Sequence, residues 1–197
     1  MEATGYKLVF LLGAAARSPS MQAQNFRAQL QMIQMVINQL KISPNDFQIG
    51  VVVYSNDASV SIPIDSYDSR RALGGAVVRI RNPGVGGRID MGFDQVNQML
   101  TKFYGSSVPR RVIAFVDQDS EVDFASNVRQ LENNNVDITM IGIGEAVNKR
   151  KLMSISSKSK FAADAADVAD VAKDIIKELK DIAKKDGKTF LAWTTPA

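Results

Sequence analysis

The chain has 197 residues, of which 24 are Lys or Arg and 21 are Asp or Glu, and it contains neither His nor Cys. It is 45% apolar and 23% charged, the composition of one soluble globular domain large enough to bury a core. Without His and Cys it has no Ser-His-Asp triad, no thiolate nucleophile, no imidazole or thiolate metal site and no disulfide framework. Carboxylate, hydroxyl, Lys, Tyr and backbone chemistry remain, and the absence of Cys leaves the cellular compartment open.

The first third of the chain alternates between strand and helix patterns. Residues 6–12 form a continuous apolar run, which predicts a strand buried on both faces of a parallel sheet. A loop of small residues at 13–20 follows. Apolar residues then recur at spacings of three and four, which predicts an amphipathic helix of about four turns; they are Phe26, Leu30, Ile33, Ile37 and Leu40. Residues 47–54 predict a second strand, and 59–63 predict the short arm of a hairpin at the edge of the sheet.

The remainder of the chain continues the alternation. The expected elements are helices at 66–80 and 90–104, a strand at 111–116, a polar helix ending at Asn134, a strand at 136–143, a helix at 148–156, a strand at 160–162 and a helix at 167–184. This order predicts an α/β fold: a doubly wound, mostly parallel six-stranded sheet with one antiparallel edge strand and helices on both faces. We expect one domain over residues 1–187 and a C-terminal tail at 188–197.

Ligands of such sheets bind at the carboxyl ends of the strands, so the loops 13–20, 84–91 and 117–123 are the candidate functional loops. These loops and their strands carry five motifs that resemble the von Willebrand factor A (vWA) domain family. The motifs are LVFLL at 8–12, FQIGVVVYS at 47–55, GGRIDMG at 86–92, VIAFVD at 112–117 and IGIG at 141–144. The resemblance covers residues 6 to about 185 and implies the Rossmann-like vWA fold.

In that family the three loops hold a divalent cation through an Asp-x-Ser-x-Ser motif, a Thr and a second Asp, the oxygen ligands that Mg²⁺ prefers. Carried onto this chain, the resemblance implies a degenerate site, because non-ligating side chains stand where the family has oxygen ligands. These positions are Gly13, Ala15, Arg17, Ile89 and Met91. Only Asp117 keeps the family residue, so we expect no bound metal and no cofactor.

Charge suggests a substitute for the missing ion. The Arg17 guanidinium can occupy the vacated position and pair with Asp117. The alternative is that Arg17 points to solvent and Asp117 caps the following turn or helix. Asp119 belongs to a row of alternating acidic residues that fits a solvated loop better than a calcium loop. Together with Arg88, these three residues are the candidate binding residues.

Basic residues occur in short groups at loops and helix ends, among them 70–71, 79–88, 110–111 and 149–151. If the fold gathers them, they can bind sulfated glycans or acidic partners. The aromatic residues that accompany nucleic-acid binding are missing, so we expect no nucleic-acid partner. The lysines of the last helix alternate with acidic residues, which is typical of a solvated helix face.

The resemblance implies a non-enzymatic protein–protein interaction module of a secreted extracellular matrix or adhesion protein, as in collagen VI-like chains. It would bind collagen or neighbouring vWA domains without metal. The alternative is an intracellular vWA-like scaffold domain in a large assembly. The longest apolar run, residues 8–16, falls short of the roughly 20 residues of a membrane helix, so we expect no membrane insertion. It does not resemble a signal peptide, and in a secreted protein we expect the signal to have been removed.

Overall fold

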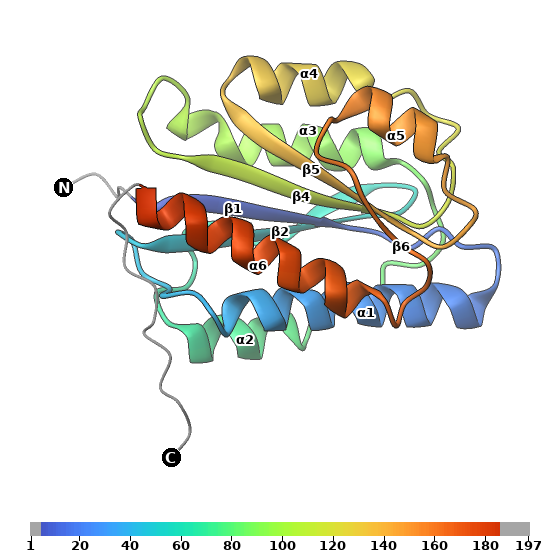
Figure 1. Ribbon diagram of the computed structural model, residues 1–197, viewed down its shortest axis with the longest axis horizontal. Coiled ribbons are helices and arrows are strands. Elements are labelled where there is room, and N and C mark those ends of the chain that lie inside the picture. Colours follow the sequence, from blue (N-terminus) through green and yellow to red (C-terminus); the bar gives the residue numbers. More distant parts are fainter. Residues whose placement is uncertain (1–4, 186–197) are drawn as a thin grey trace.

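A computed structural model describes residues 5–185, which form a six-stranded sheet in the order β3-β2-β1-β4-β5-β6 (Figure 1). The strands are β1 (Tyr6–Leu12), β2 (Phe47–Tyr54), β3 (Ala58–Ile62), β4 (Arg110–Val116), β5 (Val136–Ile143) and β6 (Lys160–Ala162). Only β3 pairs antiparallel, with β2, and the other neighbours pair in parallel. The predicted fold class is therefore confirmed. Among residues 5–185, no helix combines the length and apolarity that a membrane span requires.

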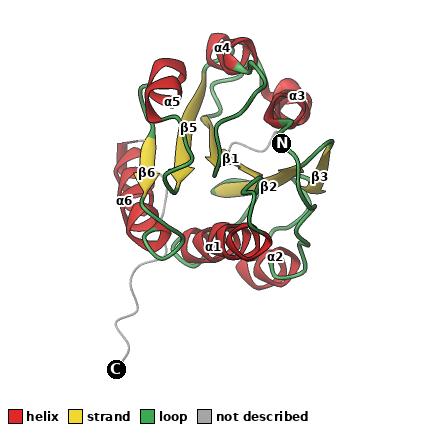
Figure 2. Cartoon of the chain, turned by 90° about the vertical axis from the view of Figure 1, so that its right-hand side faces the viewer, coloured by secondary structure: helices red, strands yellow, loops and turns green. Residues whose placement is uncertain are grey.

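Helices cover both faces of the sheet (Figure 2). One layer consists of α1 (Pro19–Ile37), α2 (Arg70–Val77) and α6 (Val168–Lys185), and the other of α3 (Ile89–Leu100), α4 (Ala125–Asn133) and α5 (Lys149–Ile155). Each layer closes its own apolar core against the sheet. Every residue of β1, β2 and β4 is buried, as expected for central parallel strands between two helical layers.

Several helix boundaries differ from the sequence prediction. The predicted helix 66–80 is shorter, because Ser69 caps the N-terminus of α2 by accepting a hydrogen bond from the Ala72 amide at 3.3 Å. The predicted helix 90–104 ends at Leu100 and continues only as a 3₁₀ turn at Thr101–Phe103. The predicted tail at 188–197 lies outside the described residues, so its boundary stays a prediction.

The start of α1 also differs from the prediction. The sequence places residues up to 20 in a loop, but the helix begins at Pro19, a residue whose fixed φ suits a first helical turn. The inward-facing positions of the first turns are Gln22 and Asn25, both buried. The apolar periodicity, which starts at Phe26, therefore begins about two turns later than the helix itself. These buried amide side chains bond the loop after β1 and Asp117.

A buried arginine fastens the last helix to the sheet. Arg111, 2% exposed, donates to the Thr139 hydroxyl at 2.8 Å and to the Glu178 carboxylate of α6 at 2.6 Å. Lys160 of β6 reaches the other Glu178 oxygen, also at 2.6 Å. Burial raises the pKa of Glu178, but the hydrogen bonds from Lys160 and Arg111 outweigh it, and the pKa lies below its usual value.

We predict that Glu178→Gln lowers the free energy of unfolding by about 2 kcal/mol at neutral pH, because it leaves the buried Arg111 without its counter-charge. Since the pKa of Glu178 is lowered on folding, its contribution is present above the unfolded pKa and is lost as the pH falls through the folded one. Urea unfolding at neutral and acidic pH tests this. Asp174→Asn, an exposed change on the same helix, is the control, and an equal loss in both variants would contradict the prediction.

Candidate functional site

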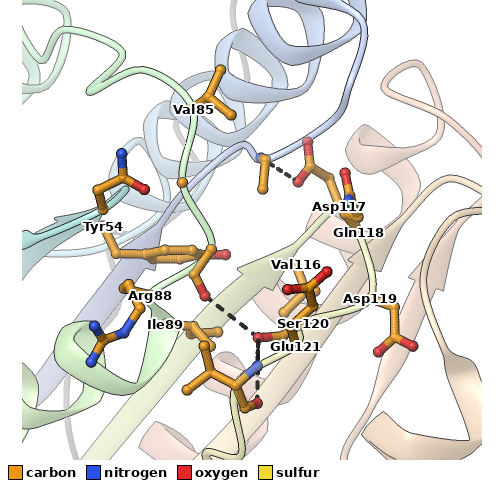
Figure 3. Close-up of a pocket in the computed structure, with 15 residues that line it drawn as sticks. Tyr54, Val85, Arg88, Ile89, Val116, Asp117, Gln118, Asp119, Ser120 and Glu121 are labelled. Atoms are coloured by element: carbon orange, nitrogen blue, oxygen red, sulfur yellow. Dashed lines mark hydrogen bonds between the residues drawn. The ribbon is translucent and has the colours of Figure 1, made fainter.

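The predicted functional loops meet at the carboxyl ends of β1, β2 and β4, where the strand order reverses between β1 and β4 (Figure 3). Two cavities open here on either side of the segment 117–121. One, of about 280 Å³, is lined by Tyr54, Arg88 and Asp117 among others. The second, of about 600 Å³, includes Arg17 and Asp119 in its lining. The four candidate binding residues therefore all border these cavities.

The Asp117 carboxylate is 3% exposed and holds two loops together. Its Oδ1 accepts a hydrogen bond from the Ala15 amide at 2.6 Å, and its Oδ2 accepts from the Ala16 amide at 3.2 Å and from Asn25 Nδ2 at 3.0 Å. Bonds from N–H donors to a carboxylate are charge-assisted and stronger than neutral ones. Asp117 thus binds back across the sheet to the loop after β1 and to α1.

Two further amides of α1 fix the same loop. Gln29 is fully buried and pairs with the Gly13 peptide, accepting from its N–H at 3.1 Å and donating to its carbonyl at 2.8 Å. Gln22 donates to the Ala14 carbonyl at 2.8 Å. Together with the Ala15 and Ala16 amides, the Gly13 peptide and the Ala14 carbonyl therefore have protein partners, as buried polar groups require.

The side chain of Tyr54 fills the space beside Gly13, the position where the family has its first Asp. A Cβ atom on Gly13 would lie 2.3 Å from Tyr54 Cζ, so no larger residue fits there. The Tyr54 hydroxyl donates to the Phe115 carbonyl at 2.6 Å. Burial, with a smaller effect from the Asp117 carboxylate, raises the pKa of Tyr54 and keeps the phenol neutral.

These residues do not fit a divalent cation. Mg²⁺ needs several oxygen ligands in octahedral array, whereas Asp117 faces three N–H donors and the Gly13 position is closed by an aromatic ring. Among the described residues, no cluster of three or more Asp, Glu, His or Cys side chains is placed to bind a metal. Nitrogen donors take the place that metal coordination has in the resembled family.

The ion pair between Arg17 and Asp117 is not formed within the described part of the chain. Arg17 is exposed, as the alternative hypothesis predicts. Asp117, however, binds the loop after β1 and does not cap the following turn or helix. Asp119 is half exposed and lies 3.4 Å from Lys151. Arg88 points outward and forms a bidentate pair with Asp90 at 2.8 and 2.9 Å, and this hydrogen-bonded pair lowers the pKa of Asp90.

The other degenerate positions take structural roles. Ile89 is 1% exposed and packs in the core under α3, while Ala15 and Met91 are half-buried. The loop before α3 is held by the Arg88 amide, which donates to the Ser55 carbonyl at 2.9 Å. The hydroxyl of Ser120 adds a long contact, 3.4 Å, to the carbonyl of Gly87 (Figure 3). Backbone contacts and apolar packing thus order this loop.

The basic groups that suggested sulfated glycans are separated by the fold. Arg110 and Arg111 are buried at the amino end of β4. Arg88 and Lys151 lie near the opposite end of the sheet and are each paired with a carboxylate. Glycan binding therefore stays a prediction without a gathered surface.

Comparison with known proteins identifies the family. The von Willebrand factor type A domain model matches residues 8–190. The chain belongs to the vWA family. The predicted resemblance is confirmed, and the degenerate positions described above are departures from the metal-site motif of this family.

The curated relatives of this vWA domain include matrix proteins. It is 23% identical to human collagen alpha-6(VI) chain, over 82% of this chain and 7% of that protein. It is 22% identical to mouse matrilin-2 and 26% identical to human collagen alpha-1(XXI) chain, in each case over 77% of this chain and 16% of the relative. The chain thus spans less than a fifth of the length of these relatives.

Solved vWA structures share the fold at lower identity. Proximal thread matrix protein 1 from the mussel byssus superposes with a TM-score of 0.76 at 19% identity, covering 90% of this chain and 46% of that one. A further structure of that protein has a zinc-occupied MIDAS motif, the metal-ion-dependent adhesion site. BatB from Bacteroides thetaiotaomicron gives a TM-score of 0.71 at 15% identity, covering 91% and 99% of the two chains. These likenesses show the fold.

The motif positions indicate which family ligands are missing, but they do not indicate the amide side chains that bond Asp117 and the loop after β1. Gln22, Asn25 and Gln29 lie three and four residues apart, the spacing of one helix face, and they share that face with Phe26 and the core. Amides in an otherwise apolar inward stripe were the available signal. Nothing in the sequence pattern indicated that the Tyr54 ring would reach Gly13.

We predict that Asp117→Ala lowers the free energy of unfolding by about 3 kcal/mol, since the Ala15 amide, the Ala16 amide and the Asn25 side chain lose their acceptor while buried. Chemical denaturation measures this. Asp119→Ala removes a carboxylate two residues away that is half exposed, and it should change stability by less than about 0.5 kcal/mol. Equal effects would refute the structural role of Asp117.

We predict that Gly13→Ala costs about 2 kcal/mol by forcing the new methyl group against the Tyr54 ring. Gly87→Ala is the matched control, because a Cβ at Gly87 meets nothing within 4 Å. In a Tyr54→Leu background the cost of Gly13→Ala should shrink, which a double-mutant cycle of thermal or urea unfolding detects. Additive effects would show that the ring is not the obstacle.

Proposed function

We propose that this vWA domain is a non-enzymatic, metal-independent protein–protein interaction module of a secreted extracellular matrix protein. Its partners are matrix proteins, collagen or neighbouring vWA domains, bound through the loops at the carboxyl end of the sheet. The matrix relatives favour this function over an intracellular scaffold. Those loops carry no pair of carboxylates suited to acid–base chemistry, which supports a binding role over catalysis.

The hydrogen bonding of Asp117 is the observation that carries metal independence. A loop that needs a cation has its ligands directed at a common point, and here that carboxylate is already satisfied by three N–H groups. The loops are therefore ordered by the protein alone, and a partner meets a preformed surface. Preorganisation reduces the entropy lost on binding.

Exposed side chains around the two cavities supply the contacts. Arg17 is exposed and makes no ion pair among the described residues, and Met21 beside it is 52% exposed. Across the smaller cavity Val85 is 65% exposed. The rims of the two cavities thus offer both a cation and exposed apolar side chains to a partner.

We predict that the domain binds immobilised fibrillar collagen with the same affinity in EDTA as in Mg²⁺, and that Mg²⁺ and Mn²⁺ leave its thermal midpoint unchanged. Arg17→Glu should weaken binding about fivefold or more, whereas Arg129→Glu on α4, an exposed control of the same charge change, should not. Surface plasmon resonance measures both. Binding abolished by EDTA would disprove metal independence. Unchanged binding by Arg17→Glu would show that the partner contacts a surface other than these loops.

A further inference from the structure

The outward face of α1 differs from an ordinary solvated helix. Among its 19 residues, Arg27 is the one charged side chain. Leu30, Gln34 and Met35 are half-buried on this face, between α2 and α6. Surface helices normally carry several charged residues on their outer face, so an outer face with one cation and no acidic residue suits contact with another protein.

Two grooves of about 500 Å³ each run along the flanks of α1. Met35 lines both. The groove toward α6 is floored by Met35 and Ile176, and the groove toward α2 includes Leu30 and Val78, the latter 68% exposed. No carboxylate lines either groove. The face is thus apolar at its centre and without negative charge.

Helix α6 separates the charges that alternate in its sequence. Lys173, Lys177 and Lys180 line the groove toward α1 at spacings of four and three residues. Acidic residues occupy the other flank, where Glu178 engages Arg111 and Lys160. The helix predicted to have a solvated face therefore also places a row of lysines beside an apolar groove.

Local contacts account for part of this row. Lys173 pairs with Asp170 at 2.9 Å, and Lys180 donates to Gln39 at 3.3 Å. Both contacts leave the groove itself without an anion, and like charges three or four residues apart on a helix repel each other. A row of lysines beside uncovered apolar surface is complementary to a partner that carries both carboxylates and apolar side chains.

We propose that the α1–α6 groove docks an acidic amphipathic helix of a partner protein. Apolar side chains of the partner at helical spacing enter the groove over Met35 and Ile176. Its carboxylates face Lys173, Lys177 and Lys180, which a helix matches because both helices have the same rise per residue. A sulfated glycan offers charge without apolar side chains, so it leaves the groove floor uncovered.

The test uses the full chain and a synthetic, fluorescein-labelled helical peptide of about 18 residues with one Leu stripe flanked by Glu. Anisotropy should show binding that weakens as salt rises, because exposed charge pairs are screened. Lys177→Glu and Ile176→Gln should each weaken it about tenfold or more. Lys185→Glu, the same charge change on the acidic flank of α6, should leave it unchanged, and thermal unfolding confirms that the variants fold.

Four results would overturn the proposal. A peptide of the same composition with its Leu residues scattered would bind equally well. Heparin oligosaccharide would bind more tightly than the peptide, and its binding would also depend on the groove floor, so that Ile176→Gln abolishes it. The chain alone would self-associate, and Lys177→Glu would abolish that self-association, which assigns the groove to a second copy. Without peptide, Lys177→Glu would change the fluorescence of the single tryptophan, Trp193, which assigns the groove to the chain's own C-terminal segment. None of these results bears on the proposed metal-independent binding by the loops at the carboxyl end of the sheet.

Discussion

A buried carboxylate must meet positive charge or N–H donors, and in this domain that requirement falls on Asp117. Desolvating an ionised carboxylate is costly unless several hydrogen bonds compensate. The two backbone amides of the loop after β1 and the Asn25 side chain supply those bonds. Because they come from different elements, satisfying one carboxylate sets the relative positions of β4, α1 and the loop between β1 and α1.

The same requirement explains the neighbouring residues. Because N–H donors already compensate the Asp117 carboxylate, Arg17 is not needed as its counter-charge and faces solvent. The closely bonded loop after β1 then needs small residues, and Gln29 can hold its backbone at Gly13. The non-ligating residues at the family's metal positions and the amide hydrogen bonds therefore fit together in one site.

Sequence and structure agree where one physical signal dominates. Strand β1 is buried at every residue and lies between Gly5 and Gly13, and β5 is buried except at Asp137 and is followed by Gly144, so the ends of both are visible in the sequence. The start of α1 was misplaced because Gln22 and Asn25 interrupt its apolar stripe. The lysine row of α6 was missed because alternation in sequence becomes separation only when the helix has a defined neighbour on each flank.

In the candidate site, too, some features can be read from the sequence and others only from the structure. Which family ligands are missing can be stated from motif positions alone, as for Gly13 and Ile89. What replaces them depends on contacts between residues distant in the chain, such as the bond from Tyr54 to Phe115. Such contacts follow from the sheet order and the packing of α1, which the alternation of elements does not specify in detail.

The Tyr54 ring beside Gly13 also bears on how this lineage can change. Restoring an aspartate at position 13 introduces side-chain atoms into space that the ring already occupies. The first step back toward a metal site therefore damages the fold before any ligand is gained. Only a path that first reduces Tyr54, and gives up its bond to Phe115, reopens that space. A single Gly13→Asp substitution therefore strains the packing around Tyr54 before it can supply a metal ligand.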